Sequence, residues 1–217
     1  MHKQILSITL LALIFLSSCT SLDLAMDHLP VLKNSELLFK DDFHDSSSGW
    51  TTNETEIDLK GYSPEGFLIV VNLPNTKSWS VPGMIFADVE VGVKAQKITG
   101  PENNLHGVIC RYLNEENYYS FLIGNDGYYG ISKTVNGQEA MLGRPVMDFS
   151  FDINQKDERN EITVGCVGSN LTLTVNGIEL LKVKDHDLPY GEVGLIVVSR
   201  EQPGVAILFN DFRVFNR

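Results

Sequence analysis

Basic residues are scarce in this sequence. Its 217 residues include 17 Lys and Arg against 28 Asp and Glu, which gives a formal net charge of −11. No cluster of Lys or Arg stands out, although such clusters are what bind phosphate backbones. Nucleic acid is therefore not expected as a partner, and an anionic bilayer would repel the chain rather than hold it.

Apolar runs long enough to cross a membrane are also missing. The almost unbroken apolar run at residues 5–16 has 12 residues, whereas a spanning helix needs about 20. His2 and Lys3 form a short basic start before it. A basic start followed by a short apolar run is typical of an export signal. We therefore expect residues 1–18 to be a signal peptide.

Cysteine is limited to three residues, and the first stands directly after the apolar run. Leu16-Ser17-Ser18-Cys19 resembles the lipobox of bacterial lipoprotein precursors. The resemblance implies cleavage before Cys19 and a lipid on its thiol. That lipid would hold the protein in the bilayer of the cell membrane or outer envelope, facing outside the cytoplasm, with residues 19–36 as a tether. The alternatives are a plain secretory signal and a buried N-terminal helix in which Cys19 is a core thiol.

The other two cysteines, Cys110 and Cys166, lie in strand-like runs. Cys166 alternates with Ile162 and Val164, which places it on an apolar face. Disulfides persist in the compartment that an export signal implies, but free cysteines are also common in cores. The sequence does not supply the Cα separation that a disulfide needs, so both readings stay open.

Helical periodicity is absent from residues 37–217, where no stretch carries a 3.6-residue apolar repeat over three turns. Alternation is present instead: Val89, Val91 and Val93 face one way, and polar residues such as Asp88, Glu90 and Lys94 face the other. Removal of residues 1–18 leaves 199 residues, enough for one well-filled core. We predict one all-β domain at residues 37–217, a two-sheet antiparallel sandwich.

Turn residues separate the predicted strands. Asn136-Gly137 and Asn176-Gly177 each stand between two strand-like runs. Both residue types accept the positive φ that a type I′ turn demands. The two pairs therefore predict two β-hairpins.

Several segments resemble the strands of concanavalin A-like jelly rolls, a group that includes laminin-G-like modules and the family-16-like domain also called 3-keto-disaccharide hydrolase. They are residues 38–43 (LFKDDF), 48–50 (SGW), 117–123 (NYYSFLI), 126–129 (DGYY), 175–177 (VNG) and 208–214 (LFNDFRV). The resemblance implies a jelly-roll sandwich. It specifies an activity poorly, because such folds host lectins, glycosidases and adhesion modules alike.

Paired catalytic carboxylates are missing from the one segment that starts like a glycosidase motif. Glu56-Ile57-Asp58 begins the Glu-x-Asp-x-(x)-Glu pattern of retaining enzymes on this fold, but Lys60 and Gly61 stand where the second Glu belongs. Two carboxyl groups about 5–5.5 Å apart are required. We expect a solvated acidic loop here and predict no catalytic residue, with a hydrolase of the 3-keto-disaccharide type as the alternative.

Metal-binding spacings are absent too. The histidines are scattered, with no zinc-binding pattern. Asn125-Asp126 and Asn210-Asp211 offer oxygen ligands of the kind that calcium takes. The same pairs are also explained by turn chemistry. No cofactor is predicted, and structural calcium is the alternative.

Aromatic side chains remain as candidate ligand contacts. Sugar rings pack their C–H faces on Trp and Tyr, while polar groups bond the hydroxyls. We predict Trp79, Arg111, Tyr118 and Tyr128 as ligand-binding residues on a concave sheet, and expect Tyr118 to be removable without unfolding the domain. Phe121 is expected in the core.

These observations favour a lipid-anchored recognition or scaffold module without catalysis, with carbohydrate as the ligand class to test. Two alternatives remain at this point. One is the glycan-active hydrolase that the fold resemblance implies, and the other is an envelope module that binds another protein through its sheet face.

Overall fold

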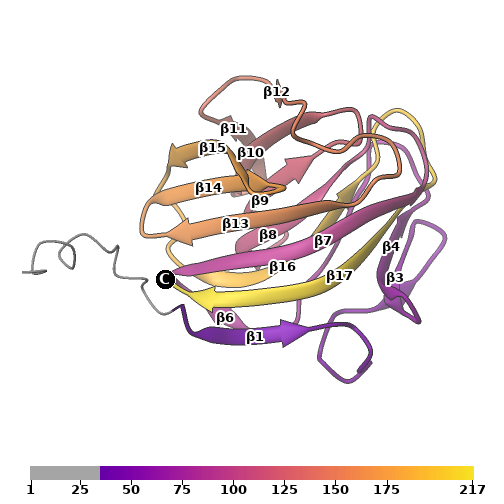
Figure 1. Cartoon of the computed structure of the whole chain (residues 1–217), viewed down its shortest axis with the longest axis horizontal. Helices are drawn as coiled ribbons and strands as arrows, with labels where there is room; N and C mark the ends of the chain where they lie inside the picture. The colour runs from indigo at the N-terminus through magenta and orange to yellow at the C-terminus, as the bar shows by residue number, and fades with distance from the viewer. Residues whose placement is uncertain (1–34) are drawn as a thin grey trace, which may run out of the picture. The chain divides into compact units, whose positions relative to one another are not determined.

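The computed structural model describes residues 35–217, and every helix or strand assigned among them is a β-strand. The strands form two antiparallel sheets, packed as a sandwich (Figure 1). The all-β sandwich predicted from the sequence is confirmed. The predicted signal peptide, Cys19 and nearly all of the predicted tether lie outside the described residues. Within residues 35–217 there is no helix that could span a membrane.

Sheet A has nine strands, and β1 (Leu37–Asp41) pairs with β17 outside the main row. The main row runs in the order β15 (Ile178–Lys184), β14 (Asn170–Val175), β13 (Asn160–Val167), β7 (Val89–Thr99), β17 (Val205–Asn216), β4 (Gly66–Val71), β3 (Asp58–Ser63) and β2 (Asn53–Glu54).

Sheet B has eight strands, with two short strands outside its main row. The main row runs in the order β11 (Gln138–Leu142), β10 (Tyr128–Val135), β9 (Asn117–Ile123), β8 (Leu105–Asn114), β16 (Gly191–Val198) and β5 (Lys77–Ser80). The short strands are β6 (Ile85–Phe86), which pairs with β16, and β12 (Asp148–Phe149), which pairs with β10.

The core fills the space between the two sheets, and strand alternation explains its composition. Val89, Val91 and Val93 of β7 are at most 2% exposed and face this core, as the sequence pattern predicted. Phe121 of β9 is also fully buried in it. Period-two alternation sends every second side chain to the same face.

Both Asn-Gly pairs form the predicted hairpin turns. Asn136 and Gly137 join β10 to β11 with φ values of 51° and 73°. Asn176 and Gly177 join β14 to β15 with φ values of 51° and 84°. Positive φ at both central residues is the requirement of a type I′ turn.

The segment at residues 38–50 has a structural role. The buried carboxylate of Asp41 accepts hydrogen bonds from the Trp50 indole (2.8 Å), the Phe43 backbone N–H (2.7 Å) and the Ser48 hydroxyl. The Phe43 and Trp50 rings pack edge to face, 5.2 Å apart. Asp41 therefore closes the loop after β1 over the end of the core.

The acidic stretch after Trp50 is not a solvated loop, and that prediction was wrong for Asp58. Asp58 begins β3 and is 9% exposed. Burial acts to raise its pKa, but hydrogen bonds from Ser78 (2.5 Å), Asn53 and Thr55 outweigh burial and lower it. Ser78 belongs to β5, so Asp58 links sheet A to sheet B.

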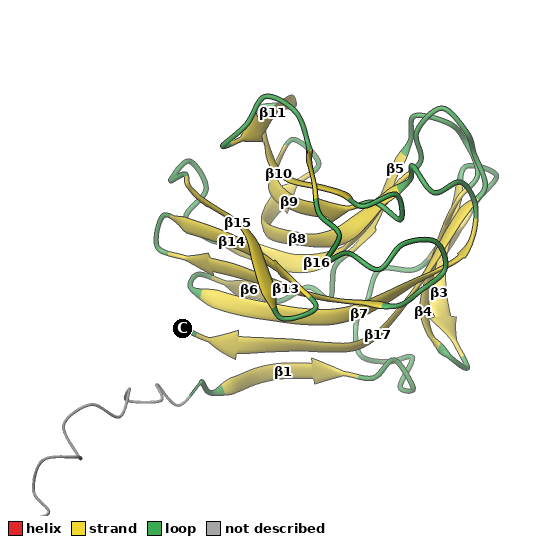
Figure 2. Ribbon diagram, turned by 45° about the horizontal axis from the view of Figure 1, so that its top comes forward, coloured by secondary structure: helices red, strands yellow, loops and turns green. Residues whose placement is uncertain are grey.

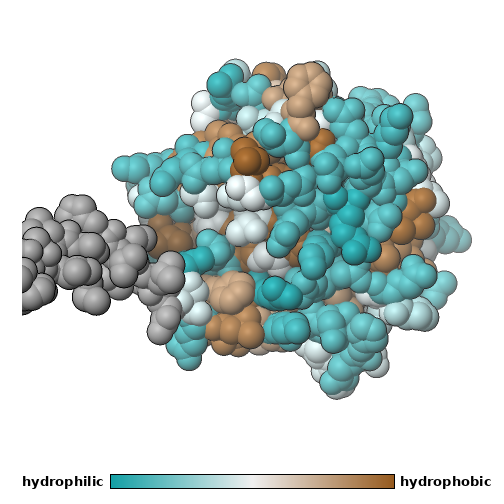
Figure 3. All heavy atoms as spheres, viewed as in Figure 1, coloured by the Kyte–Doolittle hydropathy of each residue, from teal (hydrophilic) through white to brown (hydrophobic). Residues whose placement is uncertain are grey.

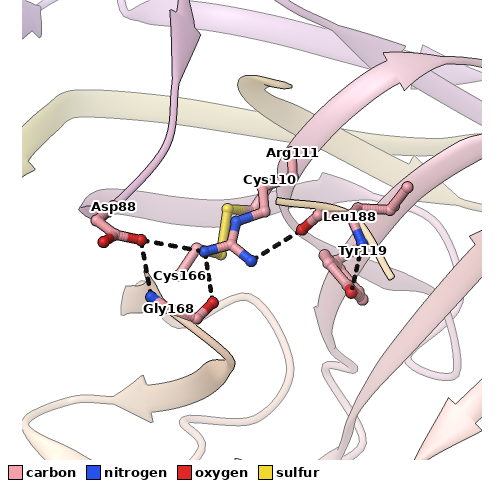
Figure 4. The surroundings of a disulfide bond; sticks show 7 residues. All are labelled: Asp88, Cys110, Arg111, Tyr119, Cys166, Gly168 and Leu188. Atoms are coloured by element: carbon pink, nitrogen blue, oxygen red, sulfur yellow. Dashed lines mark hydrogen bonds and ion pairs between the residues drawn. A yellow bond between two sulfur atoms is a disulfide. The ribbon is translucent and has the colours of Figure 1, made fainter. Parts of the chain in front are cut away.

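A disulfide joins the two sheets inside the core (Figure 4). It connects Cys110 of β8 to Cys166 of β13, whose Cα atoms are 6.9 Å apart. Both side chains are fully buried among apolar neighbours. The bond closes a loop over 56 positions of sequence, which restricts the unfolded chain.

One buried histidine lies between the sheets. His106 of β8 is fully buried, and its Nδ1 lies 3.2 Å from the side-chain oxygen of Asn104. Burial, and then the nearby charge of Lys97, lower the pKa of His106 to about 3. Lys97 itself bonds the backbone oxygen of Gly100 and pairs with Asp157. The folded protein therefore holds His106 in the neutral form.

We predict that His106 makes the domain sensitive to acid. In the unfolded chain the His106 imidazole becomes protonated near pH 6.5, whereas in the folded chain it stays neutral down to about pH 3. Above pH 6.5 His106 does not reduce the free energy of unfolding. Below pH 6.5 its titration lowers the free energy of unfolding by about 1.4 kcal/mol per pH unit. Urea unfolding between pH 7 and 5 measures the slope. His106→Asn keeps an N–H donor and should flatten it; an equal slope in both proteins would contradict the prediction.

Candidate functional site

Arg111 does not lie on the outer face of sheet B, and the sequence prediction for it was wrong. Its φ is +53°, and the pairing of β8 with β9 shifts register between Cys110 and Asn114. These features mark a β-bulge, which breaks the alternation of side chains. Arg111 is consequently 1% exposed and lies beside the disulfide (Figure 4).

The Arg111 guanidinium is used for holding the fold together. It donates hydrogen bonds to the backbone oxygens of Leu188 and Gly168, both at 2.8 Å, and lies 3.3 Å from the Asp88 carboxylate. Burial lowers the pKa of Arg111, while Asp88 acts to raise it. This side chain thus connects β8 to three segments: the one before β7, the one before β16 and the one after β13. It is buried and is not a surface contact for a ligand.

The outer face of sheet B, away from the main core, carries a second apolar cluster. Its buried members are Ile109, Tyr118, Leu122, Ile196 and Val198, and Trp79, Leu105, Tyr112 and Met147 pack against them. The Trp79, Tyr112 and Tyr118 rings lie 6.1–6.3 Å apart. Sheet B is therefore apolar on both faces, unlike a sheet with one face in water.

An ion pair crosses this outer face from one edge strand to the other. Lys77 of β5 and Glu139 of β11 meet at 2.7 Å, although four strands lie between β5 and β11. In a flat sheet these edges would be about 24 Å apart, beyond the reach of the two side chains. Sheet B is strongly curled, with β11 and β5 rising on either side of β8 and β16 (Figure 2).

The curl closes the middle of the concave face. Tyr118 is 3% exposed, and Trp79 is only partly exposed. Below them Ser120 and Ser132 bond each other at 2.7 Å, and Ser132 also donates to Glu139. The structure brings Trp79 and Tyr118 together, but it packs them against protein instead of leaving an open platform.

A pocket remains open at one end of the second apolar cluster. Its volume is about 450 Å³, within the range of small-molecule sites. The lining residues are Asp126, Tyr128, Met141, Val146, Met147 and Arg200. Gly130 makes room for this wall, because a Cβ at that position would lie 2.5 Å from the Met141 methyl group.

Three polar groups of the pocket have little or no engagement with the protein. Among residues 35–217, no hydrogen bond or ion pair holds the Arg200 guanidinium or the Tyr128 hydroxyl. The Asp126 carboxylate accepts one long hydrogen bond, 3.4 Å from the Tyr128 backbone N–H. An arginine, an aspartate and a tyrosine thus line one pocket together with the apolar side chains of Met141, Val146 and Met147.

Aromatic rings continue from the pocket across the surface. Tyr128 packs against Phe149 with ring centroids 5.6 Å apart, and Phe149 packs against Phe151 at 4.8 Å. Phe151 is 88% exposed. Apolar atoms project at the top of the molecule, near β12, whereas the visible face over sheet A is mainly hydrophilic (Figure 3).

Only part of the proposed calcium ligand set is used by other contacts, because the side-chain oxygens of Asn125 and Asn210 are buried without a hydrogen-bond partner in the described part of the chain. Asn125 donates to the Lys156 backbone oxygen, and Asp126 forms the turn described above. The Asp211 carboxylate pairs with Lys94 (3.0 Å) and Arg213 (2.6 Å). Within residues 35–217 no three His, Cys, Asp or Glu side chains group as a metal site would require.

The sequence interpretation missed most of the open pocket. Of the four predicted ligand-binding residues, only Tyr128 lines it. Arg200, Met141 and Met147 come from separate segments, and no motif connects them. Phe149-x-Phe151 was a usable signal, since two phenylalanines stand in a stretch rich in turn residues.

Comparison with solved structures shows that the domain has a jelly-roll sandwich fold, as expected from the sequence. A carbohydrate binding module, CBM66, from Bacillus subtilis has a TM-score of 0.62 at 15% identity, over 78% of this chain and 96% of that one. A protein of unknown function with a galectin-like fold, from Bacillus subtilis, has a TM-score of 0.61 at 12% identity, over 83% of this chain and 96% of that one.

Glycoside hydrolases share the fold as well. A GH16 protein from the mixed linkage glucan PUL of Bacteroides ovatus, solved with a G4G4G3G product, has a TM-score of 0.59 at 8% identity, over 82% of this chain and 99% of that one. No family model and no curated protein matches the sequence. At these identities the comparison establishes the fold, which both carbohydrate-binding and glycan-hydrolysing proteins use.

We predict that Tyr118 is required for stability, contrary to the expectation from the sequence. Tyr118→Ala should lower the free energy of unfolding by about 3 kcal/mol, because a buried ring is removed from the second apolar cluster. Tyr128→Ala is the control: this tyrosine lies on the neighbouring strand and is 45% exposed, and its loss should cost under about 1 kcal/mol. Equal urea midpoints for the two variants would show that the outer face is not a packed cluster.

Proposed function

We propose that this protein is a lipid-anchored, non-catalytic carbohydrate-recognition module. The observation that carries the proposal is the open pocket, where Arg200, Asp126 and Tyr128 converge beside an apolar wall. A ligand with both an apolar face and many hydroxyl groups matches such a lining. The shared fold of a carbohydrate binding module supports the same ligand class.

The pocket chemistry suits a neutral sugar. The Arg200 guanidinium donates hydrogen bonds, the Asp126 carboxylate accepts them, and the Tyr128 hydroxyl does both. The methionine side chains of the wall adapt to the C–H face of a sugar ring. An anionic sugar is disfavoured, because the Asp126 carboxylate lies in the pocket and the chain carries a net charge of −11.

The distribution of carboxylates supports a binding role over hydrolysis. On the outer face of sheet B, the central strands β8 and β9 carry apolar and aromatic side chains and a serine, with a glycine between them. Glu139 is held by Lys77 and Ser132. The pocket lining contains Asp126 as its single acidic residue, whereas a retaining glycosidase needs two carboxyl groups on opposite sides of one bond.

The lipid anchor is the second part of the proposal. The order of basic start, apolar run and Leu-Ser-Ser-Cys at residues 16–19 supports a lipid on Cys19. The recognition domain would then be displayed from the cell membrane or outer envelope through residues 19–36.

We predict that the lipid-free domain, residues 35–217, binds a subset of neutral glycans on an array. Arg200→Ala should weaken binding to those glycans about tenfold or more, because hydrogen bonds from a charged donor are lost. Isothermal titration with the best array ligand measures the change. Arg213→Ala is the matched control, since Arg213 is an exposed arginine on sheet A. Absence of glycan binding by the folded wild-type domain would refute the proposed function.

The anchor has its own test. Replacement of Cys19 by Ser should leave an uncleaved precursor or a protein without lipid, because a hydroxyl cannot form the thioether link. Mass spectrometry of the membrane fraction should find the wild-type N-terminus at an acylated Cys19. Cleavage at another position, with no lipid attached, would disprove the anchor.

A further inference from the structure

Three exposed rings form a continuous strip on the surface beside the pocket. This aromatic strip consists of Tyr128, Phe149 and Phe151, which are 45%, 39% and 88% exposed. Tyr128 also lines the pocket, so the strip and the pocket are one surface. A contiguous group of exposed apolar side chains on a soluble domain marks an interaction site more often than a structural one.

Burial does not explain the strip. The ring contact of Phe151 is with Phe149, at 4.8 Å, and nearly all of its side chain remains in water. Phe149 lies close to the backbone of Gly127, where a Cβ would come within 2.6 Å of its ring. The Phe149 ring therefore packs against the Gly127 backbone, next to the ring of Tyr128.

The ring orientations restrict what the strip can bind. Tyr128 and Phe149 are inclined at 72°, and Phe149 and Phe151 at 87°. Rings that are nearly perpendicular cannot all lie against one flat surface. A single chain that turns from one unit to the next can meet successive ring faces or edges instead.

We propose that the aromatic strip extends the pocket into a binding site for one soluble glycan chain of several sugar units. One unit occupies the pocket between Arg200 and Asp126, and the following units pack against Phe149 and Phe151. The flat face of a crystalline polysaccharide is not a ligand. This inference rests on the proposed function and names the kind of glycan that the site takes.

Chain length is the variable that tests the inference. The probes are glucose, xylose, fructose and N-acetylglucosamine, each with its soluble oligosaccharides of increasing length. For the sugar series that the wild-type domain binds, affinity should rise with length beyond the first unit. Phe149→Ala and Phe151→Ala should each weaken binding of the longer oligosaccharides roughly fivefold. A fivefold loss is the scale of one specific aromatic contact. Binding of the monosaccharide should not change.

The controls separate folding and general surface effects from the strip. Tyr190→Ala removes another ring, 51% exposed, at the start of β16, whereas Arg200 follows the end of that strand. Its affinities should equal those of the wild-type domain at every chain length. Phe151→Ala should keep the wild-type thermal midpoint, because the ring it removes is almost fully exposed.

Each outcome decides one of the two ideas. Absence of binding to any sugar refutes the proposed function itself. Binding that Arg200→Ala weakens, but that neither chain length nor the Phe149 and Phe151 variants alter, refutes the extended site alone. Cosedimentation of the wild-type domain with microcrystalline cellulose or chitin, lost in Phe151→Ala, would also refute it, because it would make the strip a platform for flat surfaces.

Discussion

Burial of the outer face of sheet B is the constraint on which the rest of this structure depends. A sheet at the surface of a sandwich usually keeps one face in water, but here Ile109, Leu122 and Ile196 lie on the outer face and are at most 7% exposed. Within residues 35–217 no third layer covers these side chains, and the curl of the sheet brings its own edges and loops over them. The Lys77–Glu139 ion pair joins the two edge strands across the concave face. The open pocket is the part of the concave face that the curl leaves uncovered.

Polar side chains divide into two groups by how much of their bonding capacity the fold uses. Arg111 is anchored to Leu188, Gly168 and Asp88. The Tyr119 hydroxyl donates to Asp185 and accepts from the Leu188 N–H, and burial, with the Asp185 hydrogen bond next, raises the pKa of Tyr119 to about 12. Arg200 and the Tyr128 hydroxyl have no such partners within residues 35–217. Bonding capacity that the fold leaves unused is available to a ligand.

The strands and turns could be predicted from local sequence patterns, whereas the pocket depends on tertiary geometry. The alternation of β7 and the two Asn-Gly turns depend only on residues that are neighbours in sequence. Both features could therefore be predicted from the sequence. The placement of Arg111 depends on a single β-bulge, which turns its side chain toward the interior. No residue type in β8 predicts that bulge. Asp58 was misjudged because its partner Ser78 lies 20 positions away. Arg200 and Tyr128 line one pocket although they are 72 positions apart in sequence, because β10 and the end of β16 belong to one curled sheet, which no spacing rule encodes.

The position of β17 in sheet A affects when the sheet can fold during synthesis. This strand pairs with β1, β4 and β7, so it lies at the centre of its sheet although it is the last strand of the domain to be synthesised. While a ribosome is still making residues 205–216, the three earlier strands lack the partner that completes their ladders. Such long-range pairing delays folding until the end of the domain is available. Sheet A therefore remains open at its centre until residues 205–216 have been made, and its two halves join only at the end of the synthesis of the domain.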